Sequence, residues 1–278
     1  MIWLRRVTSL SIQIELSDLK QISTRANLEA IPVELGKATS PWLTAPPATL
    51  SGITKVIGKS DYVAHVGISS GGLNGVYWVR ILLTLPNGNL LIENMGDVGK
   101  KKVDSIQIAI EPDFVYPLLR GRDIRSWRAE PSCNIVAPQD IENQREGIPA
   151  SRMKRKYPKT YSFFYSFEQE LLKRPDRKYY PVDAPFYTIR NMADYSLSTY
   201  KVVWKDMGSF IQAAVVSKHN QRTVCPEHHV MAVSLEDEDE AHYLCAALMS
   251  APRLLHHQYG YKRPCSSKRR YSALQSLK

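Results

Sequence analysis

The segment from Val76 to Leu85 constrains the fold more than any other part of the chain. It is rich in branched and aromatic residues, and Pro86-Asn87-Gly88-Asn89 separates it from a second apolar run, Leu90-Leu91-Ile92. Two apolar runs joined by a short turn that contains Asn and Gly are typical of a β-hairpin. We therefore expect two antiparallel strands here, within a strand-rich core.

Two further strands are expected at residues 200–205 and 210–216, joined through Asp206-Met207-Gly208-Ser209. Alternate residues of a strand share one face. Lys201, Val203 and Lys205 would therefore lie on one face of the first strand, which predicts a partly basic surface.

Helical spacing appears in two places. The first follows Pro158, which suits a helix start, and its apolar side chains fall on one predicted core face: Phe163, Phe164, Phe167, Leu171 and Leu172. The second follows the acidic run 236–240, which is expected to complement the dipole of a helix. Its apolar residues are Ala241, Leu244, Cys245 and Leu248. The expected class is α+β, with antiparallel hairpins and a few packed helices.

Three regions are expected along the 278 residues. Residues 1–47 are interpreted as a connector, because the prolines between Ser40 and Pro47 disfavour regular helix or strand. Residues 48–252 form the folded domain, and residues 253–278 form a basic tail. Residues 262–278 hold six basic residues and no acid, more than half of the net charge of +10. Overall basicity therefore supports nucleic-acid binding only weakly.

The stretch from Tyr116 to Ile124 sets Arg120 and Arg122 around a glycine directly after an apolar run. Guanidinium groups held at the edge of a core suit two-pronged contact with phosphate or a guanine edge. An internal salt bridge to Asp123 is the alternative.

A second basic cluster, Lys154-Arg155-Lys156, is expected in a loop that meets the helix N-terminus at Pro158, where phosphate is favoured. A solvated loop without a ligand is the alternative. The scattered histidines show no catalytic spacing, and phosphate-loop, H-E-x-x-H and G-x-S-x-G motifs are missing. The sequence therefore predicts no catalytic residue.

The cysteines do not predict a metal site. Cys133, Cys225, Cys245 and Cys265 lie far apart, as in a protein of the reducing cytoplasm. Cys225 with His228 and His229 lacks the second ligand pair of a zinc site, so no metal is predicted. No apolar run approaches the length of a membrane span or signal peptide. We expect a cytoplasmic protein with no membrane partner.

Seven segments carry a family resemblance, in a fixed order across about residues 40–250. They are Ser40 to Leu43, Gly72 to Trp78, Ile110 to Asp113 with Tyr116 to Ile124, Tyr157 to Thr160, Pro185 to Tyr187, Tyr200 to Trp204, and Ala241 to Leu244. Together they resemble the C-terminal half of N-6 adenine-specific DNA methyltransferases, including the fused restriction-modification enzymes of type IIG.

The resemblance implies a target-recognition domain, which docks double-stranded DNA and reads its sequence. In that family an N-terminal domain binds S-adenosylmethionine and transfers the methyl group. The catalytic motif of an Asn, Asp or Ser, then Pro-Pro, then an aromatic residue, is missing here. Pro46-Pro47 is flanked by Ala45 and Ala48. The glycine motif for the methyl donor is missing too, so we expect no catalysis and no cofactor in this chain, with 1–47 the remnant of a junction to a missing domain.

Contact physics then predicts a division of labour among the cations. Lys154, Arg155, Lys156, Lys201 and Lys205 would neutralise phosphates, and Arg120, Arg122 or Arg125 would approach base edges. Trp127 and Trp204 are expected in the core. Three functions stay open: a DNA-recognition fragment inactive alone, a subunit of a split methyltransferase completed by a separate catalytic chain, and a degenerate remnant or protein-interaction module.

Overall fold

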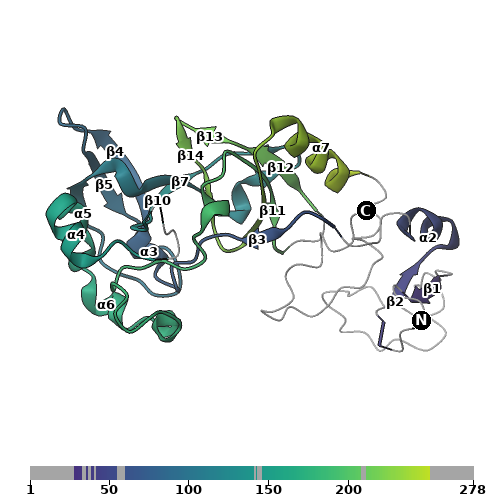
Figure 1. Ribbon diagram of the computed structural model, residues 1–278, viewed down its shortest axis with the longest axis horizontal. Coiled ribbons are helices and arrows are strands. Elements are labelled where there is room, and N and C mark those ends of the chain that lie inside the picture. Colours follow the sequence, from purple (N-terminus) through teal and green to yellow (C-terminus); the bar gives the residue numbers. More distant parts are fainter. Residues whose placement is uncertain are drawn as a thin grey trace, which may run out of the picture.

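Antiparallel sheets and short helices make up the fold, seen in a computed structural model of the chain (Figure 1). The predicted α+β class is confirmed. The structure describes residues 28–32, 36, 39–40, 42–54, 60–140, 142, 146–207 and 211–250. The predicted basic tail and the first part of the predicted connector lie outside these residues.

The larger sheet has its strands in the order β15-β7-β10-β4-β5-β6. They are β4 (Trp78–Thr84), β5 (Leu90–Asn94), β6 (Gln107–Ile110), β7 (Val115–Leu119), β10 (Cys133–Val136) and β15 (Cys225–Pro226). Neighbours are antiparallel except β15, which runs parallel to β7. The expected hairpin is confirmed as β4 and β5, and Gly88 takes a positive φ of 82° in its turn, which glycine tolerates because it has no Cβ.

A group of short helices lies beside this sheet at one end of the molecule (Figure 1). They are α3 (Asn74–Tyr77), α4 (Ala150–Lys156), α5 (Pro158–Tyr165) and α6 (Glu168–Leu172). The helix start at Pro158 is confirmed. The apolar face is confirmed for every predicted member except Leu172, which is 45% exposed. The helix breaks between α5 and α6, so Leu172 does not keep the rotational position that one continuous helix would give it.

Aromatic rings pack together with the larger sheet and these helices in one core. Tyr77, Phe163, Phe164 and Tyr187 are fully buried, and the centroids of Tyr77 and Phe164 lie 5.4 Å apart. Burial raises the pKa of both tyrosines. Their hydroxyls are satisfied by backbone carbonyls, since Tyr77 donates to Tyr187 over 3.0 Å and Tyr187 to Ile148 over 2.6 Å.

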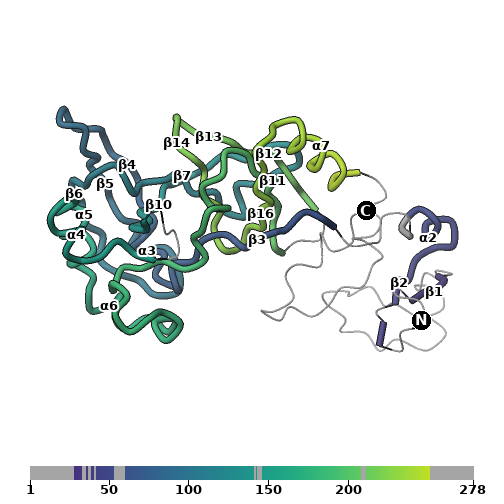
Figure 2. Tube along the Cα trace, viewed as in Figure 1, coloured from purple at the N-terminus to yellow at the C-terminus, as the bar shows by residue number. Residues whose placement is uncertain are grey.

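The smaller sheet has the order β12-β11-β16-β3. Its strands are β3 (Ala64–Val66), β11 (Tyr200–Lys205), β12 (Ala213–Val216) and β16 (Val230–Leu235). The two expected strands are confirmed as the antiparallel pair β11 and β12. Residues 208–210, the end of the expected connection and the first residue of the expected second strand, lie outside the described part of the chain, and β12 begins at Ala213. Figure 2 shows β3, from early in the chain, running beside the late strand β16, with which it pairs antiparallel.

Helix α7 (Glu238–Met249) packs on one face of the smaller sheet, against Val202 and Trp204. Its N-cap is Asp237, whose carboxylate accepts the Glu240 backbone N–H over 2.7 Å. The predicted helix and its four buried apolar residues are confirmed. The opposite face of the sheet packs through Val203 against Leu119 and Ile124, which flank the arginine turn.

Regular structure also occurs where none was expected. Residues 29–45 contain the antiparallel pair β1 (Glu29–Pro32) and β2 (Trp42–Ala45), and α2 (Pro47–Thr54) follows. The prediction that prolines prevent helix and strand from Ser40 to Pro47 is therefore wrong. Pro46 lies just beyond β2, and Pro47 begins α2, where the missing N–H costs no intrahelical hydrogen bond.

The remaining elements are short. They are β8 (Ile124–Arg125), β9 (Arg128–Ala129), β13 (Lys218–His219) and β14 (Arg222–Thr223), and the 3₁₀ turns η1 (Pro112–Phe114), η2 (Gly121–Asp123), η3 (Pro175–Tyr179) and η4 (Asp194–Ser196). Strands β8 and β9 form a hairpin, as do β13 and β14. Within the described ranges, every helix is too short or too polar to cross a bilayer.

Candidate nucleic-acid interface

Arg120 lies inside the arginine turn rather than on its surface. It is buried, and its Nε lies 3.3 Å from Oδ2 of Asp123 and 3.1 Å from Oγ of Ser132. Ser132 in turn donates to Oδ1 of Asp123 over 2.6 Å, and the Arg120 backbone N–H donates to Oδ2 over 2.9 Å. The internal salt bridge, the alternative left open by the sequence, is thus present. Arg120 braces the turn and does not present its guanidinium to a ligand.

Arg122 and Arg125, in contrast, are both exposed. They belong to the segment 120–130, which we call the arginine hairpin and which consists of η2, β8 and β9. Buried Ile124 anchors it to the core under the smaller sheet. Nη1 of Arg125 donates to the Arg122 carbonyl over 3.0 Å, so the two cations lie on neighbouring parts of the hairpin.

Trp127 occupies the tip of the arginine hairpin and is 60% exposed, so the expectation that it is a core residue is wrong. Its backbone N–H donates to the Ala213 carbonyl over 2.8 Å, which fixes the tip on β12. Its φ is +69°, a left-handed conformation that is unfavourable for a bulky side chain. Such strain often occurs where a side chain serves a ligand. Trp204, the other tryptophan, is buried as expected.

The tryptophan was missed because its neighbours gave no turn signal. Ser126-Trp127 forms a two-residue connection without the Gly, Asn or Asp that usually allows positive φ. Arg128 follows and is exposed, but it pairs with Glu130 over 2.8 Å. The exposed contact groups of the hairpin are therefore Arg122, Arg125 and Trp127, with Arg128 beside them.

Lys154, Arg155 and Lys156 lie in α4, so the prediction of a basic loop is wrong. This helix packs on the core through buried Met153, and the three cations stay exposed. Nζ of Lys154 lies 4.9 Å from the ring centroid of Tyr161. As consecutive helical residues, the three exposed cations point in directions about 100° apart, so they surround one side and the end of a short helix and remain available for the predicted phosphate contacts.

The N-terminus of α5, where phosphate was expected, already holds an anion. Oε1 of Glu111 accepts the Lys159 backbone N–H over 3.1 Å, and Oε2 accepts the Thr160 N–H over 2.7 Å and its hydroxyl over 2.6 Å. The carboxylate satisfies the amide groups that a helix start leaves unbonded. A phosphate at this helix end is therefore excluded by a residue of the chain itself.

Lys201 does not contribute to a basic surface. The prediction that it lies on a basic face of β11 is therefore wrong. Lys201 is fully buried, because the face it shares with Val203 is covered by the rest of the chain. Desolvation lowers the pKa of Lys201 to about 8, and its Nζ donates to the Ser198 carbonyl over 2.6 Å. Lys205 is half-buried and donates to Oε1 of Gln212 over 2.8 Å.

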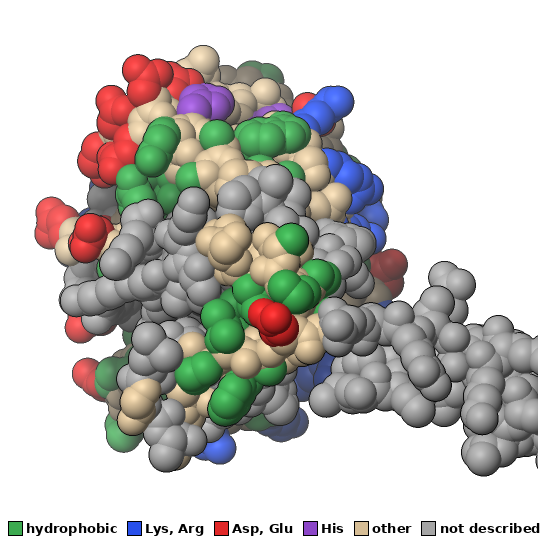
Figure 3. All heavy atoms as spheres, turned by 90° about the vertical axis from the view of Figure 1, so that its right-hand side faces the viewer, with side chains coloured by type: hydrophobic (Ala, Val, Ile, Leu, Met, Phe, Trp, Pro, Cys, Tyr) green, Lys and Arg blue, Asp and Glu red, His purple; other side chains and the backbone are tan. Residues whose placement is uncertain are grey.

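The structure does not gather the predicted cations into one patch. The arginine hairpin packs on β11 and β12, near the middle of the view in Figure 1, whereas α4 lies at its left-hand end. At the end covered by α7, acidic side chains gather along one edge (Figure 3), and every residue of the run 236–240 is exposed. That edge repels phosphate, so the arginine hairpin and α4 are the two candidate DNA-contacting surfaces.

One group of described residues has the character of a metal site. It contains His228 and His229, but its third member is Glu227 in place of Cys225. Cys225 is buried in β15, and burial raises the pKa of its thiol to about 12. Cys133 and Cys245 are also free and buried.

Comparison with known proteins leaves the function to be argued from these surfaces. No family model matches the chain, and no similar sequence is found among curated proteins. The resemblance to target-recognition domains therefore stays a prediction, which rests on the segments quoted above.

Proposed function

We propose that this chain binds double-stranded DNA in a sequence-specific manner, as the target-recognition part of an adenine-specific DNA methyltransferase or a type IIG restriction-modification system. A cytoplasmic location fits this proposal, and the free, buried thiols of the cysteines within the described residues are compatible with it. S-adenosylmethionine and the methyl-transfer residues would belong to another chain or domain. No residue of this chain is proposed to act on the DNA chemically.

The exposed arginine hairpin carries the proposal. It projects Arg122 and Arg125 from a turn that Arg120, Asp123 and Ser132 lock in place. Arginine is the residue that most often reads guanine, through two parallel hydrogen bonds to O6 and N7. A two-stranded ribbon also fits the width of the major groove. A locked ribbon that presents two arginines is therefore suited to base readout.

Helix α4 supplies the second function that a DNA reader needs. Its three exposed cations have the chemistry for backbone phosphates, which fix the position of a protein on the duplex without carrying sequence information. Because α4 and the arginine hairpin lie on separate parts of the molecule, affinity and specificity are expected to respond to different substitutions.

The test is selection from a pool of duplexes with a randomised centre, followed by sequencing of the bound fraction. Wild-type protein is expected to enrich one short sequence. Arg122→Ala should reduce the preference at one or two base pairs by about 1–3 kcal/mol, while Lys156→Ala weakens binding to all sequences alike. Lys173→Ala is the control, because Lys173 is an exposed cation that belongs to neither surface.

Two results would count against the proposal. If the wild type enriches no sequence, the chain does not recognise a target by itself. If Arg122→Ala and Lys156→Ala cause equal losses on every duplex, Arg122 contacts phosphate and does not read bases. Mixing the chain with a separately encoded catalytic protein and measuring methyl transfer would then test the split-enzyme alternative.

A further inference from the structure

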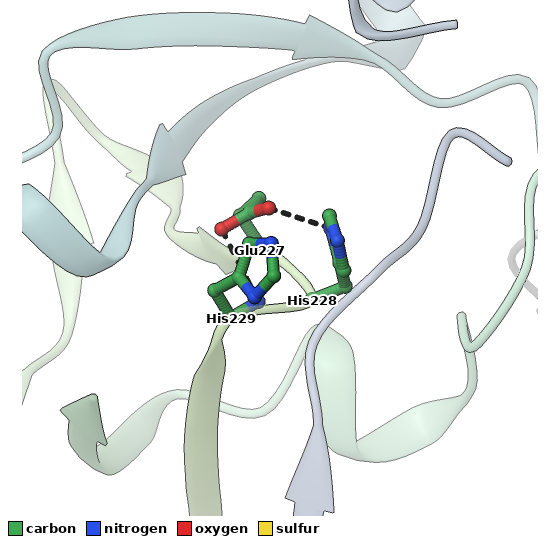
Figure 4. Close-up of side chains that lie close together, drawn as sticks. All are labelled: Glu227, His228 and His229. Carbon is green, nitrogen blue, oxygen red and sulfur yellow. Dashed lines mark hydrogen bonds and ion pairs between the residues drawn. The ribbon is translucent and has the colours of Figure 1, made fainter. Parts of the chain in front are cut away.

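The loop between β15 and β16 brings three possible metal ligands together. They are Glu227, His228 and His229, and one donor atom from each lies within 4.8 Å of the others. Figure 4 shows both imidazole rings beside the Glu227 carboxylate. Two imidazoles and one carboxylate form a donor set that Zn²⁺ and related transition metals bind in proteins.

The buried carboxylate of Glu227 contacts both histidines of this loop. Oε1 of Glu227 forms an ion pair with Nδ1 of His228 over 2.5 Å, although that buried nitrogen makes no hydrogen bond of regular geometry among the described residues. Glu227 itself is buried, and its other oxygen accepts the His229 backbone N–H over 3.2 Å. A carboxylate has about four acceptor sites, so the buried Glu227 side chain, with one imidazole and one backbone N–H as partners, keeps acceptor capacity for a cation.

Backbone contacts hold the loop in this shape. The Glu227 N–H donates to the Leu119 carbonyl over 2.9 Å, and the His229 carbonyl accepts the Asp206 N–H over 2.9 Å. Gly67 packs so closely on Pro226 and Glu227 that a Cβ there would collide with both carbonyls. The backbone of the loop is therefore positioned by the fold and does not have to be ordered by the ion.

We propose that Glu227, His228 and His229 bind one divalent transition-metal ion, with water in the remaining coordination positions because His229 is exposed. Mg²⁺ and Ca²⁺ do not fit, since both take oxygen ligands. The ion would lie beside the arginine hairpin, because a Cβ on Gly121 would come within 3.6 Å of the His229 carbonyl. Its binding does not depend on the proposed DNA function.

Co²⁺ and Zn²⁺ are the probes for this site. Untagged protein is stripped of metal with a chelator and dialysed. Titration with Co²⁺ should then produce visible absorption bands that saturate at one ion per chain, and Zn²⁺ should displace them. Mg²⁺ should leave the bands unchanged. The melting temperature should rise with Zn²⁺ and fall again with chelator, because an ion that binds only the folded state stabilises it.

Substitution of each proposed ligand tests where the ion binds. Glu227→Gln, His228→Ala and His229→Ala should each weaken Zn²⁺ binding by at least the roughly 10–100-fold that loss of an outer-shell partner costs in other metal sites. His242→Ala removes an exposed histidine of α7 and should have no effect. His229 is exposed, so its variant should keep the fold even if substitution of buried Glu227 does not. Absence of saturable binding, or affinity unchanged in His229→Ala, would overturn the proposal.

Discussion

Two buried cations of this protein are held in very different ways. Arg120 has a carboxylate and a hydroxyl within reach, whereas the hydrogen bond of Lys201 is to the carbonyl of Ser198. A buried ammonium without a carboxylate beside it is disfavoured, because water solvates the charge better than one carbonyl does. Burial of the charged Lys201 side chain is therefore expected to lower the stability of the fold.

Lys201→Met should stabilise the protein by about 1–3 kcal/mol near pH 7, because Met fills the same space without a charge. The fold lowers the pKa of Lys201 from 10.5 to about 8. Between these values the unfolded chain binds more protons, so Lys201 costs the wild type less as the pH rises through that window. The advantage of the variant should shrink accordingly, as measured by urea unfolding at several pH values. A difference that does not change with pH would contradict this account.

Trp127→Gly should separate the backbone strain at this position from the contribution of the ring to DNA binding. Glycine adopts the positive φ of this position freely, so the variant should be more stable than Trp127→Ala by about 1 kcal/mol. Both variants should bind duplex DNA more weakly if the exposed ring contacts the ligand. Chemical denaturation and fluorescence anisotropy measure the two quantities. Equal stability of the two variants would show that the left-handed backbone is not strained.

At the scale of elements, the start of helix α5 is defined by two features of different kinds. Pro158 sets its start locally, and Glu111, from the loop before η1, satisfies its first amide groups. The carboxylate thus ties the helix to the edge of the larger sheet, where β6 ends. This contact joins parts of the chain that are distant in sequence.

Glu111→Ala should lower the free energy of unfolding by about 1–3 kcal/mol, because the amide groups and hydroxyl of the α5 start lose a charged acceptor. Asp113→Ala is the matched control, since Asp113 is exposed and lies two residues away. Denaturant unfolding of both variants gives the comparison. If Asp113→Ala costs as much, the effect comes from the loop and not from the helix start.

The sequence could predict those elements whose cause is local. The β4–β5 hairpin follows from two apolar runs and a turn, and α7 follows from an acidic start and helical spacing. The burial of Lys201 could not be predicted in this way, and the sequence could not decide between the salt bridge of Arg120 to Asp123 and an exposed guanidinium. Lys201 is buried by residues from other parts of the fold, and Arg120 depends on Ser132 as well as on Asp123. Arg120 is buried and Arg122, two residues away, is exposed, because only Arg120 has these partners in the fold.

At the scale of the whole molecule, the charges are distributed unequally. The acidic run at the start of α7 lies at one end and the cations of α4 lie at the other, with the arginine hairpin on β11 and β12 between them (Figures 1 and 3). A duplex would avoid the acidic edge and be drawn to the positive surfaces, since DNA carries a dense negative charge. The net charge alone does not reveal this arrangement.

Binding to DNA should therefore weaken steeply with salt. Replacing Lys154, Arg155 and Lys156 together by Ala should reduce the slope of log K against log salt by about 2–3, if each contacts one phosphate. Anisotropy titrations over a range of salt concentrations give the slope. An unchanged slope would show that α4 does not contact the DNA backbone.

The pairing of β3 with β16 also sets an order of events during synthesis. β3 leaves the ribosome early, but its hydrogen-bonding partner is among the last described strands to be made. At roughly 5–20 residues per second, β3 waits on the order of ten seconds with its edge unpaired. A nascent chain in this interval offers that edge to other chains or to a chaperone. Chains that stop before Val230 should therefore accumulate in the insoluble fraction, whatever the quality of the larger sheet.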